Sequence, residues 1–386
     1  MSGKKEFFTA IDLFSGGGGL TVGLKAAGFN VVGAVELDRE AASTFQSNHP
    51  DTKLFIQDIR NVSGNDLLAL SPNGTIDLLS GCPPCQGFTS LTAKYHRDDP
   101  RNLLINEMIR LIEEIKPSAV MMENVPGLAQ RGKHLFQPVL DKLSDLGYQV
   151  TVGVLQVADY GVPQFRRRLV LLAGHGFSIP MPSPTHSNGR EDMPQWKTVR
   201  DAISHFSSPI SFSEAKRLGK VPSRSWHIVR DLSQQNVARL QAAKPGDSWD
   251  KIPEHLRPSC HRGGYKGFPN VYGRMEWDKV SPTITGGCTT LSRGRYGHPE
   301  EDRTISAREA ATLQTFPSEY IFDTLYMDSV CNIIGNALPC EFARHVSTQC
   351  LNALLSNRKD MIQRNEKATS KPKMAKKRSS KKKSFS

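Results

Sequence analysis

A proline-containing turn with two cysteines is the segment of this chain best suited to covalent chemistry. The apolar, strand-like residues 76–80 lead into Gly81-Cys82-Pro83-Pro84-Cys85-Gln86. The two prolines restrict the backbone before Cys85 and disfavour a helix there. Such a rigid turn at a strand end suits a cysteine nucleophile, whereas an isolated cysteine is more often a buried structural residue. The Cys82–Cys85 spacing also suits a redox or zinc pair, but the sequence has no second C-x-x-C and no suitably spaced histidine pair.

A glycine-rich segment indicates a second site, for a nucleoside cofactor. Ser15-Gly16-Gly17-Gly18-Gly19 follows the apolar residues 7–14 and precedes a helical pattern, and glycines at a helix N-terminus let the backbone approach a ligand closely. Glu36 ends the next strand-like run, where an acid can bind ribose hydroxyls, and Asp58 follows the third run, within reach of an adenine amino group. This pattern is shared by enzymes that use NAD and enzymes that use S-adenosylmethionine. A glycine-rich turn without a ligand is the alternative.

Alternating strands and helices must position these residues. Short apolar runs predict strands, and apolar residues at helical spacing predict helices between several of them. The predicted strands are residues 7–14, 31–36, 54–56, 76–80, 119–123, 149–156 and 168–173, and the predicted helices are residues 20–27, 40–48, 103–115, 135–146, 306–313 and 341–355. This alternation predicts an α/β fold, a doubly wound and mainly parallel sheet with helices on both faces. Ligands on this architecture bind at the carboxyl ends of the strands, where Phe14, Glu36, Cys85 and Glu123 lie.

The charge distribution points to a polyanionic partner. The net charge of +12 is concentrated in residues 358–386, with 12 basic and 2 acidic residues, and in residues 186–304, with 19 basic and 13 acidic residues. Clustered positive charge of this kind is typical of nucleic-acid binding. The seven cysteines are widely scattered, which predicts a reducing cytosol. We expect no membrane span and no signal peptide, because acidic residues interrupt the apolar runs.

Six ordered motifs resemble those of the DNA cytosine-5 methyltransferases of the bacterial modification-enzyme type. They are Asp12-Leu13-Phe14-Ser15-Gly16, Pro84-Cys85-Gln86, Glu123-Asn124-Val125, Gln164-Phe165-Arg166-Arg167-Arg168, Arg308-Glu309 through Leu313-Gln314-Thr315-Phe316-Pro317, and Gly335-Asn336-Ala337-Leu338-Pro339. The resemblance spans residues 8–350 and is weak at 204–280. It implies a Rossmann-like sheet of the S-adenosylmethionine-dependent methyltransferases, with a smaller, irregular target-recognition domain.

For the reaction, the resemblance implies that the Cys85 thiolate adds to carbon 6 of cytosine and thereby activates carbon 5. Glu123 would hydrogen-bond to or protonate N3 of the base; a helix cap is its alternative role. Arg166 and Arg168 alternate along a strand and so share a face. We expect one of them to steady the base carbonyl or Glu123 and the other to contact the DNA backbone or the catalytic loop, a solvated edge strand being the alternative. Cationic or dipolar groups near Cys85 should favour its thiolate.

For the ligands, the resemblance implies S-adenosylmethionine as the methyl donor and double-stranded DNA as the substrate, with no metal. The predicted cofactor contacts are Phe14, Ser15, Gly16, Gly17, Gly18, Glu36, Leu37, Asp58, Ile59, Leu104 and Asn336. The target base must be flipped out of the duplex, and the predicted DNA contacts are Gln86, Ser90, Arg262, Arg293 and Arg295. Leu37 departs from the family pattern, because many members have an aromatic residue there that stacks on adenine.

The predicted organisation is a catalytic domain at 1–203 that returns at 305–357, a recognition domain at 204–304, and a disordered basic tail at 358–386. We expect a monomer in the bacterial cytoplasm, associated with the nucleoid, and a cognate restriction endonuclease that acts on the same site without direct contact. An RNA cytosine methyltransferase on the same scaffold is the nearest alternative, but the resemblance gives those enzymes a shorter recognition segment and no Lys-rich tail. An inactive DNA-binding paralogue is the second alternative, and the presence of Cys85, Glu123 and Arg166 argues against it.

Overall fold

The central layer of the molecule is a seven-stranded sheet. The computed structural model describes residues 7–85, 99–221, 225–264 and 270–369. The strands lie in the order β3-β2-β1-β4-β5-β7-β6, and their bounds are β1 Thr9–Leu13, β2 Asn30–Glu36, β3 Lys53–Ile56, β4 Leu78–Gly81, β5 Ala119–Asn124, β6 Tyr148–Gln156 and β7 Arg167–His175. β7 runs antiparallel to β5 and β6, and the other neighbouring pairs are parallel. The prediction of a mainly parallel sheet is confirmed.

The direction of β7 decides where its first residues lie. Because β7 runs against its neighbours, it begins at the edge of the sheet where the parallel strands end. Glu123 in β5 is paired in register with Val170 of β7, and Asn124 is paired with Leu169. The segment 164–168 therefore reaches the same edge as Cys85 and Glu123. We refer to this edge as the carboxyl edge.

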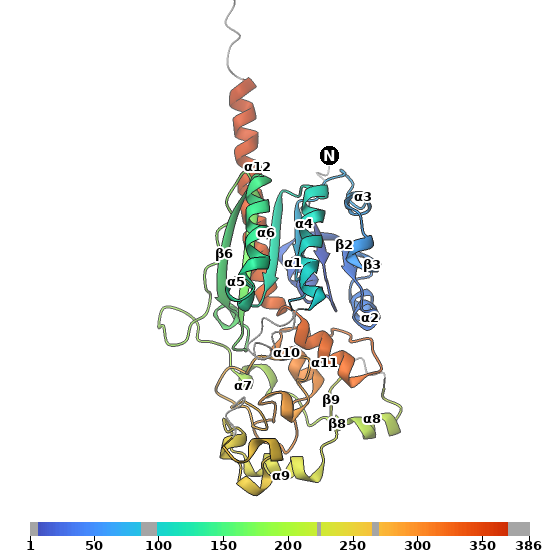
Figure 1. The fold of residues 1–386 in the computed structure, drawn as a ribbon, viewed down its shortest axis with the longest axis vertical. Helices are drawn as coiled ribbons and strands as arrows, with labels where there is room; N and C mark the ends of the chain where they lie inside the picture. Colours follow the sequence, from blue (N-terminus) through green and yellow to red (C-terminus); the bar gives the residue numbers. More distant parts are fainter. Residues whose placement is uncertain (1–6, 86–98, 222–224, 265–269, 370–386) are drawn as a thin grey trace, which may run out of the picture.

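Helices cover both faces of the sheet (Figure 1). On one face, α4 (Leu104–Ile115) and α6 (Lys133–Asp145) share a hydrophobic core with alternate strand residues such as Ile11 and Val120. On the other face, α1 (Gly19–Ala27) and α12 (Cys340–Thr369) form a second core with residues such as Ala10 and Met121. Because successive side chains of a strand point to opposite faces, one short apolar run serves both cores. The doubly wound α/β fold is confirmed.

Local sequence signals begin and end several helices. The Asp38 side chain accepts a hydrogen bond from the N–H of Ala41 and so caps α2 (Arg39–Asn48). Ser306 and Glu309 form a capping box at the start of α10 (Ala307–Leu313). The other helices are α3 Gly64–Leu68, α5 Gly127–Gln130, α7 Val199–Ile203, α8 Phe212–Arg217, α9 Gln234–Ala242 and α11 Met327–Asn336, and the 3-10 helices are η1 Ile59–Asn61, η2 Pro100–Leu103, η3 Val157–Tyr160, η4 Trp249–Lys251, η5 Glu254–Leu256, η6 Ser259–His261 and η7 Leu291–Arg293.

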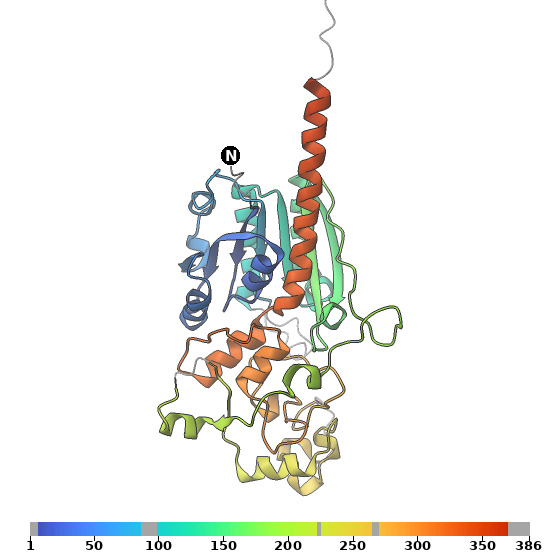
Figure 2. The same cartoon turned by 180° about the vertical axis from the view of Figure 1, so that it is seen from behind.

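A second, less regular unit lies beyond the carboxyl edge (Figures 1 and 2). Its core brings α7, α10 and α11 together with the fully buried Trp226 and Tyr296. Two short strands, β8 (Ile210–Ser211) and β9 (Ile228–Val229), form a parallel pair in it. Thus α10 and α11, which belong to the predicted return to the catalytic domain, share a core with the predicted recognition segment. The division of the chain at 203/204 and 304/305 stays a prediction.

α12 carries the chain back along the sheet and past its far end (Figure 2). It continues to Thr369, so the predicted start of a disordered tail at Arg358 falls inside this helix. The physical reason is that residues 358–367 are mostly strong helix formers such as Arg, Lys, Met, Gln and Glu, so the helix continues past its buried part. Residues 370–386 lie outside the described residues. None of the described helices is long and apolar enough to cross a membrane.

Candidate active site

The turn after β4 places the two cysteines on opposite sides of the sheet. The N–H of Cys82 donates to the Leu13 carbonyl, and the Asn124 side chain donates to the Pro83 carbonyl at 3.0 Å, so the turn is tied to β1 and β5. Cys85 packs against the core that contains α4 and α6, whereas Cys82 packs against the core that contains α1 and α12. This arrangement disfavours a disulfide between them. Within the described residues, no group of three or more histidine, cysteine or acidic side chains could hold a metal.

The surroundings of Cys85 oppose its ionisation. Burial of the thiol, and then the negative charge of Glu123, raise the pKa of Cys85 to about 12. We expected nearby cationic or dipolar groups to favour the thiolate, and among the described residues that expectation is wrong. The physical reason is that the charged side chain that acts on this thiol there is the acid Glu123, while the nearby Arg168 is paired with that acid.

Glu123 and Arg168 form a buried ion pair at the carboxyl edge. Arg168 Nε lies 2.5 Å from Glu123 Oε1, and both side chains are almost fully buried. No described group donates a well-directed hydrogen bond to this oxygen, so the carboxylate keeps hydrogen-bonding capacity for a substrate. Burial, and then the Glu123 charge, also raise the pKa of the neighbouring Cys82 thiol well above its usual value. Of the two expected arginines, Arg168 is the one that the structure brings to Glu123.

Arg166 belongs to a buried polar clamp between β7 and the second unit. Its guanidinium donates to the carbonyls of Ile284 at 2.7 Å and of Gly335 at 3.2 Å, and its Nε has no described partner. Gln164 beside it accepts a hydrogen bond from the N–H of Ile284 and donates to Gln314 at 2.7 Å. The side chain is buried and its terminal nitrogens are held by carbonyls, so within the described residues Arg166 serves this clamp. The expected contact of one of the two arginines with the DNA backbone or the catalytic loop stays a prediction.

The glycine loop after β1 is open at one position and closely packed at two. Phe14 has a left-handed backbone with φ 58°, a strained conformation for a side chain of its size, and the buried Ser15 holds the loop to β2 through the Val35 carbonyl. A Cβ at Gly16 would meet nothing within 4 Å. A Cβ at Gly17 would lie 2.4 Å from Ile333, and one at Gly18 would lie 2.6 Å from the Tyr320 hydroxyl. Of these three glycines, only Gly16 leaves space for a ligand.

Two carboxylates lie around this open position. Glu36 at the end of β2 accepts hydrogen bonds from the N–H groups of Gly16, Leu37 and Asp38 at 2.7 to 2.9 Å, and burial raises its pKa. Leu37 is 62% exposed, so its side chain is free to pack on a ligand. Asp12, not among the predicted contacts, is fully buried, and its Oδ1 has no described partner, while Thr21 donates to its Oδ2. The sequence feature that could have pointed to Asp12 is an acidic residue inside an otherwise apolar strand.

The remaining predicted cofactor contacts differ in whether their side chains are available to a ligand. The Asp58 carboxylate is paired with Arg60 at 2.6 Å, and this hydrogen-bonded pairing lowers its pKa to about 2. The Ile59 side chain is buried in the core of the α4 face, so only its backbone can face a ligand. Leu104 is partly buried at the start of α4, and Asn336 is exposed at the end of α11. The open Gly16, Glu36 and Leu37 together fit the ribose and base of a nucleoside cofactor.

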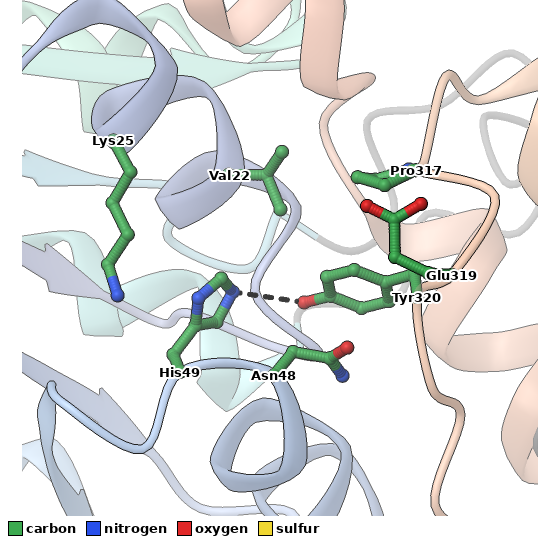
Figure 3. A pocket seen from close by; sticks show the side chains of 7 residues that line it. All are labelled: Val22, Lys25, Asn48, His49, Pro317, Glu319 and Tyr320. Atoms are coloured by element: carbon green, nitrogen blue, oxygen red, sulfur yellow. Dashed lines mark hydrogen bonds between the residues drawn. The ribbon is translucent and has the colours of Figure 1, made fainter.

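A hollow of about 300 Å³ lies beside the same loop, between α1, the end of α2 and residues 317–320 (Figure 3). In it, the His49 ring and the Tyr320 hydroxyl point toward each other with 3.1 Å between Nε2 and Oη. The Tyr320 hydroxyl donates to the Gly17 carbonyl at 2.5 Å. Burial lowers the pKa of His49 to about 4, so this imidazole is neutral at pH 7. None of the predicted cofactor contacts lines the hollow, and its side chains support the glycine loop.

The predicted DNA contacts differ in how freely they can reach a ligand. The Arg262 side chain donates to the carbonyls of Arg257 and His255, and Arg295 donates to the Gly246 carbonyl. Both arginines therefore also hold loops of the second unit together. Arg293 is exposed, and its aliphatic part lies over Gly287. Gln86 and Ser90 lie outside the described residues.

Comparisons with known proteins agree on one family. The sequence profile of the C-5 cytosine-specific DNA methylases matches residues 8–352. The Type II methylase M.HgiDII of Herpetosiphon aurantiacus is 40% identical over 343 residues, which cover 87% of this chain and 93% of that protein. The Type II methyltransferase M1.HphI of Haemophilus parahaemolyticus is 33% identical, with coverage of 89% and 86%. The crystal structure of a candidate DNA modification methyltransferase from an E. coli prophage superposes with a TM-score of 0.70 over 90% of this chain and 99% of that one, and its 24% identity supports the fold alone.

Proposed function

The chain belongs to the C-5 cytosine-specific DNA methylase family and is a DNA cytosine-5 methyltransferase, and we propose that Cys85 is its nucleophile, with Glu123 and Arg168 as its partners on the target base. One observation carries this assignment. The turn after β4, the end of β5 and the start of β7 converge at the carboxyl edge, where Asn124, next to Glu123, donates to the Pro83 carbonyl in the turn of Cys85 and Arg168 pairs with Glu123. A flipped cytosine bound there meets a thiol, an acid and a guanidinium together.

The reaction begins with the addition of Cys85 Sγ to carbon 6 of the base. The proton that the Cys85 thiol releases passes to the Glu123 carboxylate, which donates it to N3 as electron density moves there. Arg168 holds Glu123 in place and offers its remaining N–H groups to the base carbonyl. Carbon 5 becomes nucleophilic and takes the methyl group, after which its proton leaves to a base and the bond from carbon 6 to Cys85 breaks.

We propose S-adenosylmethionine as the methyl donor, bound at the ends of β1 and β2. This cofactor supplies an electrophilic methyl group on a sulfonium. Glu36 would accept hydrogen bonds from the ribose hydroxyls, the open backbone at Gly16 would allow close approach, and Leu37 would pack on the adenine with an aliphatic side chain. The Oδ1 of Asp12, which has no hydrogen-bond partner among the described residues, offers a buried acceptor beside the same loop.

The test is methyl transfer from labelled S-adenosylmethionine to duplex DNA, with tRNA as the competing substrate. A duplex with 5-fluorocytosine at the target should trap wild-type protein in a denaturant-resistant adduct, because a fluorine cannot leave carbon 5 as a proton does. The Cys85→Ala variant should bind the duplex without methylating or trapping it. Transfer to tRNA alone, or the absence of an adduct during turnover, would refute the assignment.

We propose that the enzyme works as a monomer on chromosomal DNA in the bacterial cytoplasm, and that a restriction endonuclease of the same specificity accompanies it. The support is that the relatives M.HgiDII and M1.HphI are Type II methylases. Expression of the protein in a methylation-free host, followed by bisulfite sequencing, defines the modified site. Protection of that host's DNA from a candidate endonuclease then tests the pairing.

A further inference from the structure

Two exposed side chains lie opposite the buried clamp on the segment 164–168. Gln164 and Arg166 are buried, whereas Phe165 is 51% exposed and Arg167 is exposed. Because side chains of an extended segment alternate between its two faces, Phe165 and Arg167 point together to the face that Gln164 and Arg166 do not use. Within the described ranges, no carboxylate forms an ion pair with Arg167. This face therefore carries an aromatic ring and an available positive charge.

The Phe165 ring is held in place at the junction of the two units. Its N–H donates to the Ser281 carbonyl at 2.8 Å, and its own carbonyl accepts from the Thr283 hydroxyl at 2.8 Å. The ring meets the Trp196 ring edge-on, with 6.2 Å between centroids, and the Trp196 indole donates to Asp159 at 2.9 Å. An aromatic side chain that is already positioned loses little conformational freedom when it contacts a partner.

We propose that Phe165 and Arg167 contact the duplex beside the flipped cytosine, with Arg167 on a backbone phosphate and Phe165 against the sugar or base of a neighbouring nucleotide. The inference rests on the proposed function. Arg167 is the next residue to Arg168, so it lies at the carboxyl edge beside the ion pair with Glu123. An unpaired guanidinium beside an exposed ring is the combination that holds nucleic-acid phosphates and bases.

The two side chains should give different signatures in binding experiments. The duplex probes are one that carries the site mapped by bisulfite sequencing and one with a scrambled sequence, each titrated across a salt series. Arg167→Ala should make the salt slope shallower by about 0.9, because one phosphate contact is lost, and Arg167→Lys should restore the slope. Phe165→Ala removes no charge, so it should raise the KM for DNA by about tenfold, the loss expected for a stacked base, and leave the slope unchanged.

Arg190→Ala is the matched control. Arg190 is an exposed arginine in the loop between β7 and α7, where it pairs with Asp192 at 2.6 Å, so its loss removes the same charge from a side chain that already has an acidic partner. Equal slopes for Arg167→Ala and Arg190→Ala would overturn the inference, as would variants that bind DNA normally but lose a protein partner. Covalent trapping of the wild-type protein by 5-fluorocytosine is measured in parallel. If trapping fails, the proposed function fails; if it succeeds while the slopes agree, only this inference does.

Discussion

At Cys85, the acid that serves the reaction also opposes ionisation of the nucleophile. Burial is the larger cause of the raised pKa, and the charge of Glu123 is the second. When the proton released by Cys85 lies between Glu123 and N3 of the bound cytosine, the negative charge of Glu123 is reduced, and that obstacle to forming the thiolate is removed. The geometry thus links activation of the thiol to occupation of the pocket by the correct base. Such a link protects the free enzyme from adventitious reaction at Cys85.

Replacing Glu123 with Gln should make Cys85 more reactive toward iodoacetamide while it abolishes most methyl transfer. The substitution removes a negative charge, so the pKa of Cys85 should fall and its thiolate fraction at pH 8 should rise several-fold. In the wild-type protein, alkylation should keep rising above pH 10, whereas an unperturbed thiol levels off near its pKa of about 8.5. Mass spectrometry of the Cys85 peptide measures both effects, with the exposed Cys260 as the internal control. A lower alkylation rate in the variant would contradict this electrostatic account.

Glu36 should matter more than Asp58 for cofactor affinity. Glu36→Ala removes a carboxylate that three backbone N–H groups orient toward the open Gly16, and loss of a charge-assisted hydrogen bond should raise the Kd for S-adenosylmethionine by about tenfold or more. Asp58→Ala should have a smaller effect, because Arg60 already occupies both oxygens. Isothermal titration with the cofactor measures both, and the Kd for DNA should hardly change. A larger effect of Asp58 would show that Arg60 moves away when the cofactor binds.

At the level of elements, the segment that leads into β7 has two functions, which different side chains perform. Arg168 faces the chemistry through Glu123, while Arg166 and Gln164 hold the segment 284–285 and the end of α11 against the sheet. The clamp fixes the second unit relative to the strand that carries Arg168. A shift of the second unit would therefore move Arg168 and change the geometry of its ion pair with Glu123.

Arg166→Ala should destabilise the protein rather than weaken a DNA contact. It leaves the carbonyls of Ile284 and Gly335 buried without donors, and an unsatisfied buried polar group costs about 1–3 kcal/mol. We expect a thermal transition lower by several degrees and faster proteolysis between the two units. The salt slope of DNA binding should stay as in the wild type, because no phosphate contact is lost. A normal melting temperature with a shallower slope would restore Arg166 to the DNA interface.

At the scale of the whole molecule, α12 runs from the carboxyl edge to beyond the far end of the sheet. The helix has 30 residues and begins close to the glycine loop, where the Leu338 carbonyl lies near Gly19. At 1.5 Å per residue it spans about 45 Å, so it ends beyond the opposite end of the sheet. We expect the basic residues that follow the helix to contribute phosphate contacts. Such contacts would raise the affinity for every sequence alike.

Deletion of residues 370–386 should make the salt slope shallower and spare specificity. This segment holds eight lysines and arginines and no acid, and if about three phosphate contacts form, the slope should fall by roughly three. Cognate and scrambled duplexes should weaken together, and turnover at saturating DNA should stay nearly unchanged. Binding of both duplexes across a salt series measures this. An unchanged slope would leave the tail a role in solubility, and an altered methylation site would mean that it reads bases.

The sequence by itself determined the layered fold and the edge at which the chemistry lies, because short apolar runs and helical spacings are local signals. The sequence did not predict α11, because its N-cap residue is Tyr326, which makes no side-chain capping hydrogen bond and so leaves no helix-start signal. Tertiary structure alone decided which arginine pairs with Glu123, which glycine is open and what raises the pKa of Cys85. These outcomes depend on the antiparallel direction of β7, on contacts of Gly17 with α11 and on burial. Each joins residues far apart in the chain, and no local pattern records such a contact.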